Sequence, residues 1–322
     1  MEQPVLAIDL GGTKIVAALI SRQGEMLARE YTPSLAGRGR ETVIKQLSSA
    51  IDGLLKARNI SPTRLHSISI AAAGAIDSEK GLVTQSPNLP GWRDVPLANI
   101  IKEKYGVKTF LINDANAAAL GEHRFGAGKG VNNLVLMTIG TGIGGGIIID
   151  GKLYAGASGG AGEIGHMTMD VNGPRCNCGN IGCLEMLASG TAIARDAVRL
   201  IREGGRSSLV EIVKDKLENI TAEKVAQAAK AGDSLASMVI ARAADYLGVG
   251  LVNLVNIFNP EMIIIGGGVA NMGDLLLAPA RKMVKERAFR LSAQAVRIVP
   301  AQLGEDAGVF GAAVFAFEEG VS

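Results

Sequence analysis

The stretch V-L-A-I-D-L-G-G-T-K at residues 5–14 decides the fold, because a short apolar run ends at a carboxylate beside two glycines. The run over 5–9 predicts a buried strand, and the glycines at 11–12 predict a tight turn. A partner strand is predicted over 15–20 and a third strand over 26–32. The chain therefore opens with a predicted β-meander.

The same hairpin pattern returns near the middle of the chain. A strand is predicted over 133–140, followed by the glycine turn G-T-G-I-G-G-G at 140–146 and a partner strand that ends at Asp150. Repetition of one pattern indicates an α/β protein with two duplicated βββαβα lobes that face each other across a cleft. We expect a small lobe from residues 1–117 with 306–322, and a large lobe from residues 118–305.

Helical and strand periodicity places the remaining elements. Apolar positions recur at helical spacing over 41–58 and would bury one face of a helix. The other predicted elements are helices at 97–105, 187–203, 234–258, 274–289 and 307–317, a helix that opens at Asp114, and strands at 67–71, 108–113, 262–265 and 296–299.

Composition narrows the class of protein. Hydrophobic residues make up 48% of the chain and charged residues 20%, and 33 basic residues nearly balance 31 acidic ones. No basic block is long enough to follow a nucleic-acid backbone, so we expect no nucleic-acid partner. The start M-E-Q-P-V-L-A-I-D-L-G-G lacks a basic region, and apolar runs such as 134–139 and 262–269 are far shorter than the roughly 18 residues of a membrane span. We therefore expect a cytoplasmic protein without a membrane anchor.

All three cysteines lie in C-N-C-G-N-I-G-C, as Cys176, Cys178 and Cys183, and His166 precedes them by ten residues. Three thiolates and one imidazole form a closed tetrahedral set for Zn²⁺, and the intervening glycines let a loop wrap around a small ion. The alternatives are reduced structural thiols or one disulfide with a leftover cysteine, which a cytosolic setting disfavours. We expect a structural zinc site.

The two glycine turns are candidates for holding phosphate, because backbone amides in such turns face phosphate oxygens. A plain hairpin turn would explain either one without a ligand, but the presence of two favours a pair of loops that hold one triphosphate. Neither has the Walker A or dinucleotide-binding pattern. The candidate residues are Asp9, Gly11, Gly12, Thr13, Lys14, Thr141 and Gly142.

A third glycine run, Gly266-Gly267-Gly268, follows the predicted strand 262–265 and precedes a helix. The backbone there can pass close to a flat ring such as adenine. A helix-start turn is an equally good explanation, and the small residues at 304–308 can serve packing alone.

Asn113 and Asp114 end a predicted strand and begin a helix. A carboxylate held at the edge of a sheet can accept the proton of an attacking hydroxyl. Asparagine and aspartate are also favoured helix caps, and the two roles are compatible.

Carboxylates also flank the cysteine loop. Glu163 and His166 lie in G-E-I-G-H, and Glu185 follows Cys183 closely. A zinc-bound loop would fix these groups in space for sugar hydroxyls, whereas the alternative is solvated surface charge. Asn88 and Gly74, each on a loop after a strand, are weaker candidates.

Taken together, these motifs resemble the ROK family of sugar kinases and repressors, in particular its glucokinase-like members. The resemblance spans nearly the whole chain. Its motifs are D-L-G-G-T-K at 9–14, S-P-N-L-P-G-W at 86–92, N-D-A-N-A-A-A-L-G-E at 113–122, T-I-G-T-G-I-G-G-G at 138–146, G-G-A-G-E-I-G-H at 159–166, C-N-C-G-N-I-G-C-L-E at 176–185 and I-I-G-G-G-V at 264–269. Leu184 departs from the family, in which tryptophan is common at this position.

The resemblance implies a two-lobed actin-like ATPase fold, related to ribonuclease H, and an ATP-dependent hexose kinase of carbohydrate metabolism and glycolysis. It implies that Asp114 is the general base and that Asp9 works with Mg²⁺ and the phosphates of ATP. Further implied roles are phosphate contact for Gly11, Gly12, Thr13, Thr141 and Gly142, nucleoside contact for Gly266, Gly267 and Gly268, sugar binding for Asn113, Glu163, His166 and Glu185, and zinc binding for His166, Cys176, Cys178 and Cys183.

Several alternatives stay open at this point. Glucose is the expected sugar, ahead of fructose, mannose, N-acetylmannosamine and N-acetylglucosamine. A sugar-responsive repressor is a second possibility, but repressors of the family carry a helix-turn-helix domain for which a first strand at Val5 leaves no room. A zinc hydrolase is disfavoured, because a Cys₃His site offers water no position. The resemblance also implies a homodimer or homotetramer.

Overall fold

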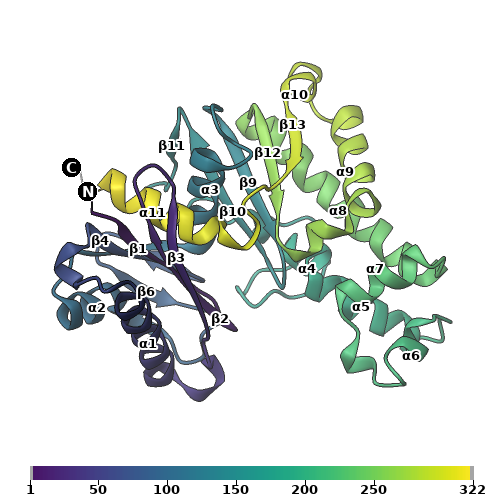
Figure 1. Cartoon of the computed structure of the whole chain (residues 1–322). Coiled ribbons are helices and arrows are strands. Elements are labelled where there is room, and N and C mark those ends of the chain that lie inside the picture. The colour runs from purple at the N-terminus through teal and green to yellow at the C-terminus, as the bar shows by residue number, and fades with distance from the viewer. Residues whose placement is uncertain (1–2, 320–322) are drawn as a thin grey trace. The chain divides into compact units, whose positions relative to one another are not determined.

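The computed structural model describes residues 3–319 as an α/β protein with two compact units (Figure 1). Unit 1 contains the described residues of 1–132, 146–162 and 301–322, and unit 2 contains 133–145 and 163–300. The division into lobes after residue 117 and before residue 306 stays a prediction, and its residues 1–2 and 320–322 lie outside the described part.

Unit 1 is built on a five-stranded sheet in the order β3-β2-β1-β4-β8. Strand β1 pairs antiparallel with β2 and parallel with β4, which in turn pairs parallel with β8. The predicted meander is confirmed. The strands are β1 (Val5–Leu10), β2 (Lys14–Ile20), β3 (Met26–Pro33), β4 (Ser67–Ala72) and β8 (Thr109–Asn113).

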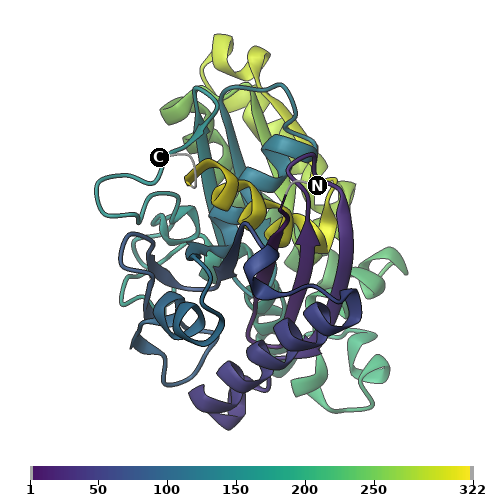
Figure 2. The ribbon, with the colours of Figure 1, turned by 60° about the vertical axis from the view of Figure 1, so that its left-hand side comes forward.

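The two faces of this sheet bury different helices. Helix α1 (Arg40–Arg58) shares a core with Leu6, Ile8 and Leu10 of β1, and Figure 2 shows it lying across the strands. Because side chains alternate along a strand, Asp9 points to the opposite face. There it meets α11 (Ala307–Glu319), where a Cβ on Gly308 would lie 2.8 Å from the Asp9 Oδ2. The carboxylate is therefore held at the end of β1, against the start of a helix.

Helix α3 (Asp114–Phe125) packs closely along α11. A Cβ on Gly311 would lie 1.5 Å from the Ala117 carbonyl oxygen, and one on Gly121 would lie 2.4 Å from the Ala307 carbonyl oxygen. Only glycine permits such approaches of two helix backbones.

Unit 1 also holds elements that sequence periodicity did not predict. A three-stranded sheet consists of β5 (Ala75–Asp77), β6 (Leu82–Gln85) and β7 (Arg93–Val95). The predicted helix at 97–105 is confirmed as α2 (Leu97–Tyr105).

A second five-stranded sheet has the order β11-β10-β9-β12-β13, and the boundary between the units falls within β10. Its order repeats that of the first sheet, with a meander followed by two parallel strands, so the predicted duplication is seen in the topology. The strands are β9 (Leu134–Ile139), β10 (Ile143–Ile149), β11 (Lys152–Leu153), β12 (Met262–Gly266) and β13 (Arg297–Pro300).

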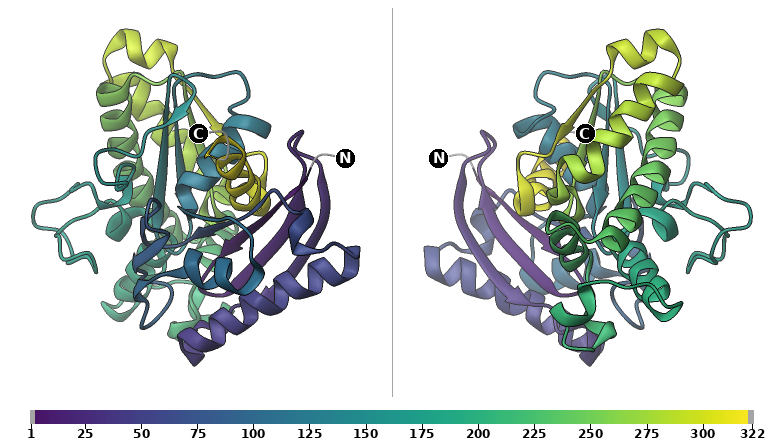
Figure 3. Two further views of the ribbon diagram at one scale, coloured as in Figure 1. Left: turned by 90° about the vertical axis from the view of Figure 1, so that its left-hand side faces the viewer. Right: turned by 90° about the vertical axis from the view of Figure 1, so that its right-hand side faces the viewer.

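In unit 2, α8 (Ser234–Phe258) and α9 (Asp274–Arg287) lie side by side along one face of β9 and β12 (Figure 3). The single helix predicted at 187–203 is wrong. Ser189 is extended, with ψ 168°, and its side chain caps a new helix by accepting from the Ala192 N–H. The unit's other helices are α4 (Glu185–Ala188), α5 (Gly190–Arg202), α6 (Leu209–Ile212), α7 (Ala222–Lys230) and α10 (Arg290–Ala295).

Among the described residues, α8 alone has the length and apolar composition of a membrane span. It contains Arg242 and Asp245, and 61% of its apolar window is buried inside the protein. Such burial is typical of the core helix of a globular unit. The expectation that the chain has no membrane anchor stays a prediction.

Candidate functional site

The first glycine turn is a tight hairpin. The Gly11 N–H donates to the Lys14 carbonyl oxygen at 2.9 Å, so this amide is already used within the turn. Thr13 is exposed, and Lys14 forms an ion pair with Glu305 at 2.8 Å. A Cβ on Gly12 would lie 2.6 Å from the Asn88 carbonyl oxygen, so the turn packs against the 86–92 loop. The predicted phosphate role of the turn stays a prediction.

Asp9 and Asp114 are electrostatically coupled. Burial raises the pKa of Asp9 from 3.8 to about 7; repulsion from Asp114 adds to the shift, and Lys14 opposes it. Asp114 begins α3, and its Oδ1 accepts the Ala115 N–H at 2.8 Å. Two carboxylates that repel each other at the end of a sheet can share a cation or a proton.

Asn113 is the N-cap of α3. Its Oδ1 accepts from the N–H groups of Ala115 and Asn116 at 2.9 and 3.0 Å, and its Nδ2 donates to the Gly74 carbonyl oxygen at 3.0 Å. Gly74 has φ 115°, and a Cβ there would lie 2.3 Å from the Gln85 carbonyl oxygen. The structure thus brings the predicted sugar residues Asn113 and Gly74 together and confirms the cap, while sugar binding stays a prediction.

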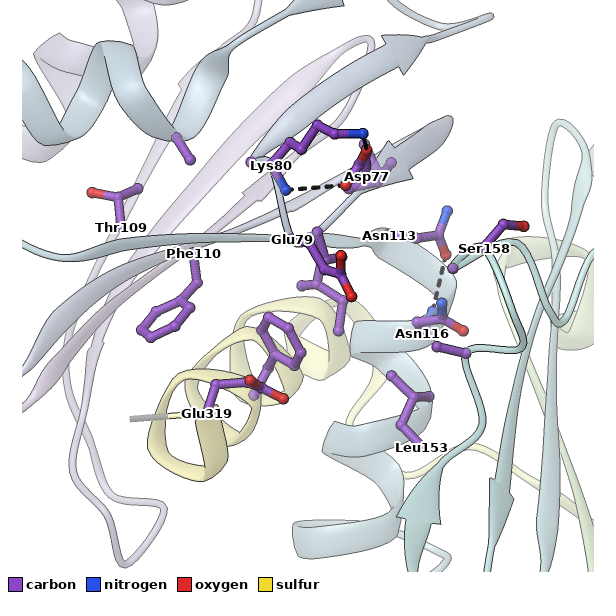
Figure 4. A pocket seen from close by; sticks show the side chains of 18 of the residues that line it. Asp77, Glu79, Lys80, Thr109, Phe110, Asn113, Asn116, Leu153, Ser158 and Glu319 are labelled. Atoms are coloured by element: carbon purple, nitrogen blue, oxygen red, sulfur yellow. Dashed lines mark hydrogen bonds and ion pairs between the residues drawn. The ribbon is translucent and has the colours of Figure 1, made fainter. Parts of the chain in front are cut away.

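A cavity of about 750 Å³ lies in unit 1 beside Asn113 (Figure 4). Asn116 lines it from α3; this side chain is 5% exposed, and its Oδ1 has no hydrogen-bond partner among the described residues. Phe110 and the ion pair of Asp77 with Lys80 at 2.8 Å also line the cavity. An unpaired buried amide oxygen is suited to a ligand that donates hydrogen bonds, as a sugar does.

The second glycine turn is held by groups that follow the cysteine loop. The Oε2 of Glu185 accepts the Ile143 N–H at 2.9 Å, and a Cβ on Gly142 would lie 2.2 Å from that oxygen. Thr191 donates its hydroxyl hydrogen to the Thr141 carbonyl oxygen at 2.7 Å. Glu185 is therefore not a solvated surface charge, because it fixes the turn that was predicted to hold phosphate.

The start of α5 meets the third glycine run as well. The Gly190 N–H donates to the Gly140 carbonyl oxygen at 2.8 Å, and a Cβ on Gly190 would lie 3.0 Å from Val269. Gly267 has φ 85°, and a Cβ on it would lie 2.4 Å from the Ile139 carbonyl oxygen, so glycine is required there. The 266–268 turn and the second glycine turn are thus neighbours within unit 2.

From this junction a groove of about 590 Å³ runs along α5. It begins at Thr191 and includes Ala194, Arg195, Val198 and Ile220. Sequence reasoning missed these residues, although Ser189-Gly190-Thr191 carries a helix-cap signal at which the groove begins. Apolar walls with arginine at the rim suit a flat ring.

The four predicted zinc ligands come together. Their ligand atoms all lie within 4.8 Å of one another; the Cys178 and Cys183 Sγ atoms are 3.7 Å apart, and the Cys176 Sγ is 3.7 Å from the His166 Nδ1. A tetrahedral zinc with bonds of about 2.3 Å separates two sulfurs by about 3.8 Å. The cysteines are unpaired, which excludes the disulfide. The residues therefore fit zinc by both chemistry and spacing.

The thiols of this cluster differ in their surroundings. Burial raises the pKa of Cys176, and it raises that of Cys183 to about 12, while the Asn180 N–H lowers the pKa of Cys178. A bound dication would compensate for keeping all three as thiolates. The other ring nitrogen of His166, Nε2, lies 3.8 Å from the Glu163 Oε2. Glu163 is itself exposed.

Comparisons with known proteins identify the family of the chain. The model of the ROK family matches residues 5–319. The chain is 39% identical to the glucokinase of Thermotoga maritima over 96% of both chains, and 37% identical to the xylose repressor of Caldicellulosiruptor bescii over 95% of this chain and 76% of the repressor. The ROK family glucokinase of Streptomyces griseus, solved with glucose and AMPPNP, superimposes with a TM-score of 0.84 and 34% identity over 98% of this chain and 99% of that one.

Proposed function

Because the chain belongs to the ROK family, we propose that it transfers the γ-phosphoryl group of ATP to a hexose, converting glucose to glucose 6-phosphate. Two of the compared relatives are glucokinases, one of them solved with glucose and an ATP analogue. The observation that carries the proposal is the coupled pair Asp9 and Asp114, with one carboxylate beside a glycine turn and the other at the start of α3.

In the proposed reaction, the oxygen of the sugar 6-hydroxyl attacks the γ-phosphorus while the bond to the bridging oxygen of ADP breaks. Asp114 accepts the hydroxyl proton and orients the oxygen. Asp9 would hold Mg²⁺, which supplies positive charge to the phosphates when it is bound. The N–H groups of Gly12 and Thr13, those of the 141–142 turn and the Lys14 ammonium would further stabilise the negative charge that spreads over the phosphate oxygens, while Gly11 shapes the first turn.

Sugar binding is proposed for residues of both units. In unit 1 these are Gly74, Asn88, Asn113 and Asp114, with the unpaired Asn116 oxygen nearby. In unit 2 they are Glu163, His166 and Glu185, held by the cysteine loop. The expected cleft between the lobes stays part of this proposal.

Zinc and the nucleoside complete the proposal. His166, Cys176, Cys178 and Cys183 would hold a structural Zn²⁺, whose four protein ligands keep it closed to water. The nucleoside of ATP would lie between Gly266, Gly267 and Gly268 and the groove along α5, since both adjoin the second glycine turn.

We further propose a cytoplasmic enzyme of glycolysis that forms a homodimer or homotetramer. Ile257, Phe289 and Leu291 of unit 2 leave 68%, 76% and 78% of their surface exposed. The Phe289 N–H donates to the Asn256 Oδ1, which places two of these side chains on neighbouring segments. Light scattering of the purified protein tests the oligomeric state.

The decisive test replaces the proposed base. Asp114→Asn should lower kcat by about 10³-fold or more while glucose binding, measured by calorimetry, is retained. Asp94→Asn makes the same chemical change at an exposed strand position and should leave kcat unchanged. Near-normal turnover of the Asp114 variant would refute the assignment. A panel of glucose, fructose, mannose, N-acetylmannosamine and N-acetylglucosamine in an ATP-coupled assay identifies the sugar.

A sugar-responsive repressor is the second candidate, favoured by the 37% identity to the xylose repressor. Its test is a binding assay with DNA from the chain's own operon. Sugar-dependent, sequence-specific binding without ATP turnover would establish it in place of the kinase.

A further inference from the structure

Glu122 is a buried carboxylate without a cationic partner. It lies on α3, it is fully buried, and none of residues 3–319 forms an ion pair with it. Burying a lone carboxylate is costly unless hydrogen bonds replace water. A carboxylate buried in this way therefore indicates a specific role as a hydrogen-bond acceptor, which an apolar residue could not fill.

Three backbone N–H groups replace the lost water. The Oε1 of Glu122 accepts from Gln302 and Leu303 at 2.9 and 2.7 Å, and its Oε2 accepts from Ala127 at 2.8 Å. A Cβ on Gly126 would lie 2.1 Å from Oε2, so the glycine leaves the space that the carboxylate occupies. Hydrogen bonds to an ionised acceptor are the stronger kind. Glu122 thus anchors the 302–303 backbone to α3.

The anchored segment leads directly to the first glycine turn. Glu305 forms the 2.8 Å ion pair with Lys14, and Asp306 forms a 2.9 Å ion pair with Arg29 on the same meander. Gly308 then packs on the carboxylate of Asp9. Two of these contacts reach groups proposed for the phosphate side of the reaction, and all of them lie within unit 1.

We propose that Glu122 is a positioning residue for Mg·ATP, which acts through residues 302–308 on Lys14 and Asp9. The inference rests on the proposed phosphoryl transfer. Glu122 itself touches no reactant. Its role is to fix residues 302–308 beside the first glycine turn. Asp114 begins the same helix, so α3 positions Asp114 directly and Asp9 through Glu122 and residues 302–308.

Glu122→Gln tests this, because it keeps the size of the side chain but replaces one acceptor oxygen by an NH₂ group that faces a backbone N–H. We expect the KM for Mg·ATP to rise about tenfold, with the KM for glucose changed less than about twofold. Amide hydrogen exchange at Gln302 and Leu303 should accelerate by about tenfold as well, while that of β1 stays protected. Glu261→Gln is the matched control, because Glu261 accepts the Asn133 N–H at 2.9 Å on an exposed site.

Gly126→Ala provides a second variant that keeps the charge and displaces the carboxylate. It should reproduce the change in KM for Mg·ATP, even where Glu122→Gln folds poorly. If a folded Glu122→Gln or Gly126→Ala variant has an unchanged KM for Mg·ATP and unchanged amide exchange at 302–303, the positioning role of Glu122 is refuted, but the proposed kinase function is not. Wild-type protein without ATP-dependent phosphorylation of any sugar in the panel would instead overturn the proposed function, with the exchange measurement still reporting on the anchor.

Discussion

Asp9 should destabilise the folded protein at neutral pH, and Asp9→Asn should relieve this. Its carboxylate is partly buried against Gly308 and repelled by Asp114, which raises its pKa from 3.8 to about 7. A raised pKa means that the folded state favours the protonated acid. Between these two values the unfolded chain is ionised and the folded chain is not, so the free energy of unfolding falls as pH rises from about 4 to about 7.

The size of the effect follows from the shift. Each unit of pKa is worth about 1.4 kcal/mol, so the full shift corresponds to at most about 4 kcal/mol above pH 7. About half of this is already lost at about pH 5.5, because the unfolded carboxylate is ionised there. The advantage of Asp9→Asn over wild type should therefore grow by about 2 kcal/mol between about pH 5.5 and pH 8, or about 4–8 °C in Tm for a domain of 150–250 residues.

Scanning calorimetry without nucleotide or Mg²⁺ measures this difference. Asp9→Asn should melt above wild type at pH 8, and the gap should shrink at pH 5.5. Asp94→Asn, an exposed control in the same unit, should show no such gap at either pH. A variant that melts no higher than wild type at pH 8, or a gap that does not depend on pH, would refute the reasoning about Asp9.

Three further predictions follow from the site. The KM for Mg·ATP should rise as pH falls from 8 to 6, because protonation of Asp9 removes the proposed ligand of Mg²⁺; a flat KM profile by steady-state kinetics would contradict this. Cys178→Ser should lower the zinc content measured by mass spectrometry and raise the KM for glucose, whereas a zinc-free protein with normal KM would exclude the proposed role of the cluster. Gly311→Ala should destabilise unit 1 by more than about 2 kcal/mol in urea unfolding, since its Cβ would lie 1.5 Å from the Ala117 carbonyl oxygen; Gly37→Ala, at a site without positive φ where no described atom lies within 4 Å of the new Cβ, is the control without a clash.

Elements with uninterrupted periodicity were predictable from the sequence. Helix α8 over 234–258 and α2 over 97–105 have the predicted bounds. The strands β5 to β7 have only three or four residues each and lack an apolar alternation long enough to detect. The break at Ser189 was hidden because apolar positions continue on both sides of it, and only the cap hydrogen bond reveals it.

Some residues of the candidate site could likewise be predicted from the sequence, and others could not. Spacing alone predicted that His166, Cys176, Cys178 and Cys183 come together, because these four residues lie within an eighteen-residue segment and form a local cluster. Glu122 could not be found, since a glutamate on a helix normally indicates a solvated face, and its acceptor role depends on amides 180 and 181 residues away. Any residue at positions 302 and 303 other than proline would offer the same backbone N–H group, so the sequence contains no signal for these long-range hydrogen bonds.

Helix α3 links these observations. Its first residue is the proposed base, Asn116 two residues later lines the cavity, and Glu122 near its end anchors the segment that contacts Asp9. The alanines between them keep the helix narrow enough for Gly311 of α11 to touch the Ala117 carbonyl group. A rigid helix packed in this way fixes the distance between its two ends. Substitutions at the start of α3 should therefore affect turnover, whereas those at its end should affect the KM for Mg·ATP, although both act through one element.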